Sequence, residues 1–204
     1  MGKGVPVTDA VLENIRNRRS VRVFDDKDVS ESDIQTVLRA ANHAPSAHNQ
    51  QSWRFIVVRG EKKQELAALA SKKAAEFPKT SSALLRMAAR SISSAPVVVG
   101  VVNTGEMVTH ANDRFSTDKK NSCDFFRTME IQSSAAAIQN LLLAATALGI
   151  SSVWLGVLIL IKDDVMRLFE EPEGEFMAAV PLGYNEKLRT APPKKSLEAT
   201  VKYL

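Results

Sequence analysis

The chain has little cysteine, little histidine and no long uncharged apolar run. Its 204 residues include one cysteine, Cys123, so no disulfide can form within the chain, and this suits a reducing compartment. The three histidines have no cysteine or carboxylate neighbours at ligand spacing, which argues against a metal centre. No stretch approaches the roughly 20 apolar residues of a membrane helix, and no signal peptide begins the chain. We therefore expect a cytoplasmic protein with no metal and no membrane partner.

The sequence has only a small excess of positive over negative charge. Lys and Arg number 27 against 23 Asp and Glu, a net charge of +4. Nucleic-acid binding usually needs a basic stripe, which this sequence lacks, whereas a small anionic ligand suits so slight an excess. Gly-rich phosphate loops and serine nucleophile elbows are absent too. A cofactor that carries its own chemistry needs no such apparatus.

The length and the 45% hydrophobic content fit one domain over residues 1–204. Apolar periodicity and breaker residues predict the elements. A first helix is expected after Thr8, with Val11, Leu12 and Ile15 on one face, and further helices are expected over residues 31–44, 61–76, 82–90, 124–148 and 163–170. The expected strands cover residues 53–58, 96–102, 150–155 and 176–182. Helices followed by a mixture of strands and helices predict an α/β or α+β fold with a central sheet.

Two segments suggest contact with another subunit. The helix over residues 124–148 is apolar around most of its circumference after Ile131, and in a chain this short that predicts a subunit interface. Leu197, Ala199, Val201 and Tyr203 alternate with polar residues near the C-terminus. This alternation predicts an edge strand over residues 196–203, with another subunit as one place for it to pair.

A cluster of cations lies between the first two expected helices. Arg18, Arg19, Ser20 and Arg22 supply several donors within five residues. Phosphate recognition favours the guanidinium fork, and a serine hydroxyl adds a further bond. Cations also favour the negative end of a helix dipole, and the first helix ends here. A phosphate site and a helix terminus are therefore both open interpretations.

The connection from residue 45 to residue 52 is rich in hydrogen-bonding side chains. Asn49, Gln50 and Gln51 carry amides that both donate and accept, which matches the alternating donor and acceptors of a flavin pyrimidine edge. An ordinary polar link between a helix and a strand would have a similar composition. The density of amides directly before the Trp53 strand favours a cofactor contact.

These two segments, taken with three later ones, resemble the nitroreductase family of FMN-dependent oxidoreductases. The ordered set covers nearly the whole chain and consists of Arg18–Arg22, Ala44–Trp53, Leu148–Gly156, Pro181–Tyr184 and Pro192–Glu198. The resemblance implies an α+β fold, an α-β-α sandwich with a central, mostly antiparallel sheet flanked by helices. It also implies an intertwined homodimer with exchange of the C-terminal strand and two FMN molecules at the interface.

The resemblance also implies which residues bind the cofactor. The cationic segment, with Lys194 or Lys195, would meet the phosphate and ribityl end of FMN. Residues of the partner subunit would hold the ring, and backbone N–H groups would approach the flavin N5 and O4 region. The cationic segment consists of Arg18, Arg19, Ser20 and Arg22. The ring contacts from the partner are Pro45, Ser46, Asn49 and Gln51, and the backbone donors are Leu155 and Gly156. No side chain is implied as a general acid.

We expect from this an enzyme that takes hydride from NAD(P)H onto flavin N5 and passes it to a small electrophilic acceptor, such as a nitroaromatic, a quinone or an enone. A flavin-binding protein that is no reductase, serving as a reservoir, a sensor or an enzyme of FMN metabolism, is the alternative. A basic interaction module is a third reading, which the modest charge disfavours. Lys194-Lys195 stands where the family often has Arg, and Ser52 where Pro is common. The polar residues 105–122 do not indicate which substrate the protein binds.

Overall fold

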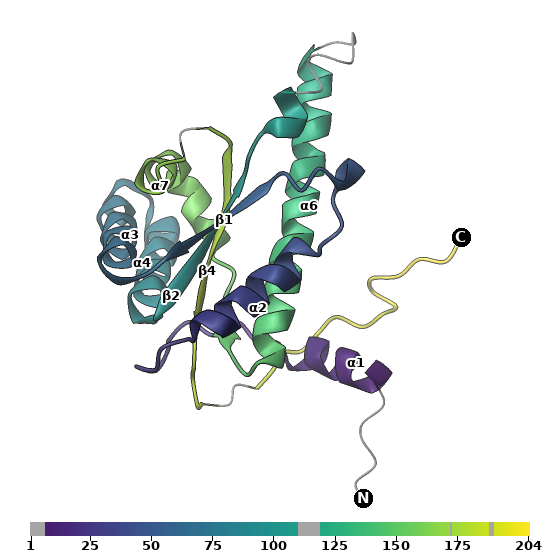
Figure 1. Cartoon of the computed structure of the whole chain (residues 1–204), viewed down its shortest axis with the longest axis horizontal. Helices are drawn as coiled ribbons and strands as arrows, with labels where there is room; N and C mark the ends of the chain where they lie inside the picture. The colour runs from purple at the N-terminus through teal and green to yellow at the C-terminus, as the bar shows by residue number, and fades with distance from the viewer. Residues whose placement is uncertain (1–6, 110–118, 172, 188–189) are drawn as a thin grey trace, which may run out of the picture.

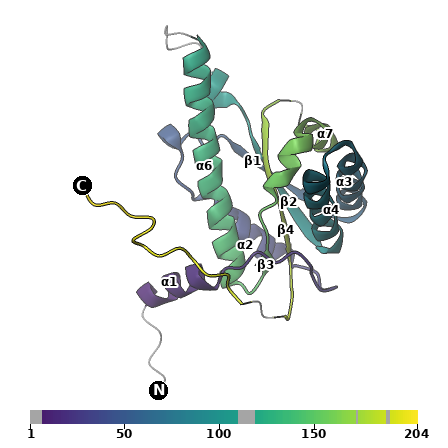
Figure 2. The same cartoon turned by 180° about the vertical axis from the view of Figure 1, so that it is seen from behind.

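The computed structural model describes residues 7–109, 119–171, 173–187 and 190–204, and it has three layers. A central sheet lies between two groups of helices (Figures 1 and 2). One group consists of α2 (Glu31–Asn42) and α6 (Lys119–Ala147). The other consists of α3 (Gly60–Lys73), the 3₁₀ turn η2 (Ala74–Glu76), α4 (Lys79–Ser94) and α7 (Lys162–Leu168). This arrangement is the expected α+β sandwich.

The sheet has the strand order β1-β2-β4-β3, and its named strands pair antiparallel. The strands are β1 (Trp53–Val58), β2 (Val97–Asn103), β3 (Ser151–Ser152) and β4 (Glu175–Gly183). Every residue of β2 is buried, as the valine run predicts for a central strand covered on both faces. A register shift at Val101/Val102 interrupts the ladder between β2 and β4.

Each face of the sheet has its own hydrophobic core. Leu66, Leu85 and Ile92 pack against one face, together with Phe169 and Phe176. On the other face, buried side chains of α2 and α6 meet alternate residues of the strands, and these are Ile34, Val37, Ile138, Leu141, Val99 and Val180. The two periodicities, close to 3.6 in helices and 2 in strands, place these side chains inside.

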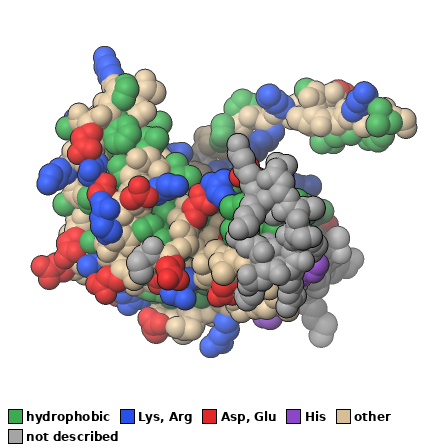
Figure 3. Space-filling model, turned by 90° about the horizontal axis from the view of Figure 1, so that it is seen from above, with side chains coloured by type: hydrophobic (Ala, Val, Ile, Leu, Met, Phe, Trp, Pro, Cys, Tyr) green, Lys and Arg blue, Asp and Glu red, His purple; other side chains and the backbone are tan. Residues whose placement is uncertain are grey.

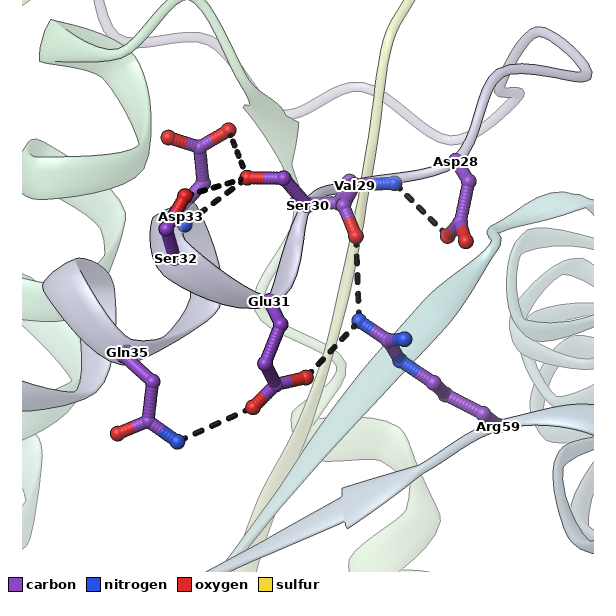
Figure 4. A network of polar contacts seen from close by, with 8 residues as sticks. All are labelled: Asp28, Val29, Ser30, Glu31, Ser32, Asp33, Gln35 and Arg59. Atoms are coloured by element: carbon purple, nitrogen blue, oxygen red, sulfur yellow. Dashed lines mark hydrogen bonds and ion pairs between the residues drawn. The ribbon is translucent and has the colours of Figure 1, made fainter.

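The start of α2 shows how local chemistry positions an element (Figure 4). The Ser30 hydroxyl caps the helix by accepting the Asp33 N–H at 3.1 Å, as the Ser-Glu-Ser-Asp sequence predicts. Arg59, directly after β1, donates to the Val29 carbonyl at 3.1 Å and lies 3.6 Å from the Glu31 carboxylate. The beginning of α2 is therefore tied to the end of an edge strand.

Helix α6 is buried along one stripe within a single chain. Glu130, Ser134, Ile138 and Leu141 lie on that stripe, whereas Leu148, just past the helix end, remains 40% exposed. In Figure 1 the helix stands beside α2, and α1 (Val7–Asn17) lies near its C-terminal end. The apolar residues predicted around most of α6 are thus only partly covered by this chain.

Two expected strands are shortened or unpaired in the single chain. Residues 150–155 form only the two-residue β3, because regular pairing with β4 stops at Ser152 and returns as a single bridge between Leu155 and Ala179. In the single chain, residues 198–200 form a turn, and the Ser196 and Leu197 carbonyls accept the N–H groups of Ala199 and Thr200. Among the described residues, the exposed segment 196–203 pairs with no strand.

The C-terminal residues 190–204 are all exposed and form a tail that leaves the body (Figures 1 and 2). Figure 3 shows a narrow arm extending from the body, with hydrophobic and basic side chains along it. Leu197 is 73% exposed and Tyr203 is 92% exposed. Among the described residues, no helix is long and apolar enough to cross a membrane.

Candidate functional site

The cationic segment extends the sheet beyond its short edge strand. Ser20 forms a parallel bridge with Ser152 of β3, and the Val21 N–H donates to the Ser152 carbonyl at 2.9 Å. Val21 is buried and Arg22 is exposed, so successive side chains point to opposite sides. The pairing fixes the backbone between Arg19 and Arg22 and presents its cations at the edge of the sheet.

A cavity of about 490 Å³ lies beside this segment. The predicted residues Arg18, Arg19, Ser20 and Arg22 line it, and the tail contributes Lys194. Its other lining residues are Ile15, Arg16, Thr190, Ala191 and Pro192. Lys195 is exposed on the tail and does not line the cavity. The fold thus brings together five of the six residues expected at a phosphate.

The cations of this cavity lack acidic partners. Within the described residues, Arg18, Arg19 and Arg22 have no carboxylate within ion-pair distance. Arg19 donates through Nη1 to the Arg18 carbonyl at 2.9 Å, while its buried Nε has no hydrogen-bond partner. Arg22 donates to the Ser20 carbonyl at 3.3 Å. Grouped guanidinium donors without a carboxylate favour an anion such as phosphate.

A second cavity of about 480 Å³ adjoins the first, because Arg19 lines both. It is bordered by Asn17, Asn185 and Lys187, and by residues that follow α6, among them Gly149 and Ser151. No pattern in the sequence indicates this cavity, since its walls come from three distant segments. The φ of Gly149 is +72°, so the turn after α6 uses a conformation that glycine adopts readily.

The amide-rich loop has an unusual backbone. It contains the 3₁₀ turn η1 (Ala47–Asn49), and His48, Asn49 and Gln51 all have φ values between +51° and +53°. Residues other than glycine rarely take this conformation, and such outliers cluster at functional sites. The Gln51 N–H donates to Ser46 Oγ at 3.0 Å, and the Gln51 side-chain amide donates to the Asn49 carbonyl at 3.1 Å. These bonds fix the loop internally.

The loop presents most of its predicted ligand-binding side chains to solvent. Pro45, Asn49 and Gln51 are exposed, and Ser46 is half-buried. The Trp53 indole N–H donates to Asn42 Oδ1 at 3.0 Å, which joins the two ends of the loop. An exposed amide cluster on a fixed backbone is suited to pairing with a planar ligand.

The chain does not bring the loop and the cationic cavity together. Neither of the two cavities has a lining residue between 45 and 51. Helix α6 contacts the loop and α1, which precedes the cationic segment, at different heights, because the Ala47 N–H donates to Ser133 Oγ and the Asn14 side chain donates to the Leu143 carbonyl. At about 1.5 Å rise per residue, these two anchors are roughly 15 Å apart along the helix axis.

The predicted backbone donors at Leu155 and Gly156 differ from each other. Leu155 exchanges hydrogen bonds with Ala179 of β4, and its N–H donates to the Ala179 carbonyl at 2.9 Å. Gly156 begins the 3₁₀ turn η3 (Gly156–Ile161). Of this pair, Gly156 is therefore the N–H to consider for a ligand, while Trp154 beside it is 37% exposed.

Two buried polar residues of α6 carry no motif and were missed from the sequence. Ser133 Oγ accepts the Ala47 N–H of the amide loop at 3.2 Å. The Glu130 carboxylate, 2% exposed, accepts the Met107 N–H at 2.9 Å. Burial raises the pKa of Glu130, the nearby Glu106 and Glu175 raise it further, and the Met107 bond opposes them. The only sequence signal for Ser133 and Glu130 was their polar character within an apolar helix.

The histidines show no metal-binding arrangement in the described part of the chain. His43 and His48 are exposed, and His110 lies outside the described residues. Half of the polar segment 105–122, residues 110–118, is also outside them, including Asn112, Arg114 and Asp118. Within the ranges described, no group of three His, Cys, Asp or Glu residues is placed to hold a metal.

Comparison with known proteins identifies the family. The family model described as the nitroreductase family matches residues 15–184. An Archaeoglobus fulgidus protein, provisionally named as an NADH dehydrogenase/NAD(P)H nitroreductase, is 35% identical over 146 residues, 72% of this chain and 67% of its own. A Methanothermobacter thermautotrophicus protein with the same name is 32% identical over 177 residues, 85% of this chain and 76% of its own.

A solved structure agrees with these sequence matches. The crystal structure of a provisionally named nitroreductase from Desulfovibrio desulfuricans, in complex with FMN, has a TM-score of 0.69 and 25% identity to this chain. The match covers 95% of this chain and 96% of that one. Fold, family model and sequence relatives therefore lead to one conclusion: this chain belongs to the nitroreductase family.

Proposed function

We propose that this protein takes hydride from NAD(P)H onto N5 of FMN and passes the reducing equivalents to a small electrophilic acceptor, such as a nitroaromatic, a quinone or an enone. The observation that carries this proposal is the cavity in which Arg18, Arg19, Arg22 and Lys194 converge without a carboxylate partner. Its donors suit a phosphate, and FMN ends in one.

Family membership fixes the class of enzyme. The chain is an NAD(P)H-dependent flavin oxidoreductase, and FMN is its cofactor. When bound, the flavin accepts and donates hydride itself, so the protein has to bind, orient and shield it without a dedicated acid.

The cationic segment binds the phosphate end in this proposal. The guanidinium groups of Arg18 and Arg22 supply paired donors, the Ser20 hydroxyl adds one, and Lys194 closes the cavity from the tail. Lys is a point charge without a planar fork, so its contact is less directional than an arginine contact. The unpaired, buried Nε of Arg19 supplies a further donor.

A second subunit supplies the ring end in this proposal. The amide loop contacts α6 at a different height from α1 and lines neither cavity, which supports a ring contact that comes from another chain. We therefore place Pro45, Ser46, Asn49 and Gln51 of each subunit against the flavin bound by the other. The Gly156 N–H then approaches the flavin from the first chain.

Exposed apolar side chains support the homodimer. On α1, Val11, Leu12 and Ile15 are 57%, 46% and 47% exposed, and the tail adds Leu197 and Tyr203. Soluble proteins rarely expose contiguous apolar patches without a partner for them. A second copy of this chain would cover α1 and the open side of α6, and would give the tail an edge to pair with.

The purified protein tests the proposal directly. It should be yellow, with one FMN per chain, and NADH or NADPH should bleach the flavin rapidly in a stopped-flow mixture. A panel of nitroaromatics, quinones and enones added to the reduced protein then identifies the acceptor by reoxidation. A colourless protein that does not bind added FMN would refute the proposal, and bound FMN that neither nucleotide reduces would favour the flavin-binding alternative.

A further inference from the structure

The amide loop needs external support to hold its shape. Three of its residues, His48, Asn49 and Gln51, lie in the left-handed region, where side-chain-bearing residues are strained. Bonds within the loop link Asn49 to the Ser46 carbonyl and Gln50 to the Ala47 carbonyl, both at 3.0 Å. Such local bonds set the shape of the loop but leave its position on the body undetermined.

One buried side chain supplies that position. Ser133 of α6 is 6% exposed, and its Oγ accepts the Ala47 N–H at 3.2 Å. Ala47 also packs against a small apolar cluster around Met107 and Phe126. The other side-chain contact to the middle of the loop joins Gln50 to Glu106 at 3.5 Å and is exposed.

The Ser133 hydroxyl is itself held in one orientation. It donates to the Met129 carbonyl, one turn earlier on α6, at 2.7 Å. Because its hydrogen is used there, its lone pairs remain to accept the Ala47 N–H. The bond between helix and loop therefore has a fixed direction and comes from the most buried helix of this face.

We propose that Ser133 is a positioning residue for the flavin ring. It holds Ala47, which lies between the candidate ring contacts Ser46 and Asn49, and so fixes the distance of those groups from the ring. This inference rests on the proposed FMN site. It assigns to α6 a role in binding beyond its part in the core, and that role acts at the ring end of the cofactor.

The next residue provides a matched control. Ser134 is 0% exposed, lies on the same helix, and donates its hydroxyl to the Asn103 side chain of β2 instead of to the loop. Removing the Ser134 hydroxyl deletes its bond to Asn103, whereas removing the Ser133 hydroxyl deletes its bonds to Met129 and to Ala47 of the loop. Only the Ser133 change alters the support of the amide loop.

The experiment compares apoprotein of the wild type with Ser133→Ala, Ser133→Thr and Ser134→Ala. Each is titrated with FMN and with riboflavin, which lacks the phosphate, and the absorption spectrum of each bound flavin is recorded. We expect Ser133→Ala to weaken both flavins by a similar factor of about five, the size of one neutral hydrogen bond, and to alter the flavin spectrum. Ser133→Thr keeps the hydroxyl and should restore both, while Ser134→Ala should match the wild type.

Several results would overturn the inference. Wild-type affinity and spectrum in Ser133→Ala would show that the loop needs no such support. An equal loss of flavin affinity in Ser134→Ala would show that the effect comes from a general loss of stability. If Ser133→Ala fails to fold, Ser133→Cys keeps the volume with a weak acceptor, and wild-type flavin binding there would count equally against it. A wild type that binds no flavin would instead refute the proposed function, and the inference with it.

Discussion

Arg22 and Lys194 line the same cavity, although they lie near opposite ends of the chain. The first is held by the pairing of Ser20 with β3, and the second comes from the exposed tail. Neither has a carboxylate partner among the described residues. Two cations from separate segments, neither with an acidic partner among the described residues, make the cavity suited to an anion.

Replacing Arg22 by Ala should weaken FMN binding while leaving riboflavin binding almost unchanged. A charge-assisted hydrogen bond contributes about 1.5–3 kcal/mol, and because Arg22 is exposed we expect the lower end, roughly a ten-fold rise in Kd. Flavin fluorescence titration of the apoprotein measures both ligands. Arg90→Ala, on the outer face of α4, is the matched control for loss of an exposed arginine. Unchanged FMN retention in Arg22→Ala would place the phosphate elsewhere.

The apolar face of α1 should be needed for the dimer. Val11 and Leu12 are 57% and 46% exposed in the single chain, so Val11→Asp with Leu12→Asp places two charges in the proposed interface. Burying unpaired charges is costly, and the variant should elute as a monomer and lose its flavin. Light scattering coupled to absorbance measures both properties at once. Leu84→Asp, at a side chain 43% exposed on α4, should remain a yellow dimer. A flavin-bearing monomer would contradict the composite site.

Mixed dimers should show whether the phosphate contacts and the ring contacts of one site come from different chains. Arg22→Ala removes a phosphate contact and Asn49→Ala removes a ring contact, so each homodimer carries two weakened sites. If these two contacts come from different subunits, a heterodimer has one intact site and one site with both defects. Heterodimers isolated with two affinity tags should therefore retain one tightly bound FMN per dimer. Two equally weakened sites would mean that Arg22 and Asn49 of one chain serve the same flavin.

The elements were largely predictable from the sequence because their signals are local. The valine run of β2, the Ser30 cap of α2 and the spacing of Ile34, Val37 and Ala41 each express a short-range rule. The convergence of Arg22 with Lys194 was expected only through the family resemblance, since no local pattern joins residues so far apart. The structure supports that expectation with the cavity itself.

The remaining features depend on contacts that leave no trace in a short window. Positive φ values at His48 and Gln51 are unusual for residues other than glycine, so no propensity predicts them. Ser133 acts on a backbone N–H, and any residue at position 47 except proline supplies one. The alternation in residues 196–203 predicts a strand, but a strand needs a neighbouring strand to pair with, and in the single chain the tail bonds only locally.

Glu130 should make the free energy of unfolding fall as the pH rises. Burial raises its pKa above the ordinary value of 4.5, so the folded chain keeps this proton at pH values where the unfolded chain has released it. The stability contributed by that proton is complete below pH 4.5 and is lost as the pH rises through the folded pKa. Glu130→Gln keeps an oxygen for the Met107 N–H but has no proton to lose, so its stability lacks this fall.

Chemical denaturation at a series of pH values measures the effect. The free energy of unfolding of the wild type minus that of Glu130→Gln should be most favourable to the wild type at the acidic end, should decrease with rising pH, and should then level off. Glu61→Gln, at an exposed position on α3, controls for the loss of a carboxylate at the surface. A difference that is flat across the range, or that grows with pH, would show that Glu130 is ionised in the folded protein without a penalty. The buried Met107 contact would then stabilise a carboxylate instead of a neutral acid.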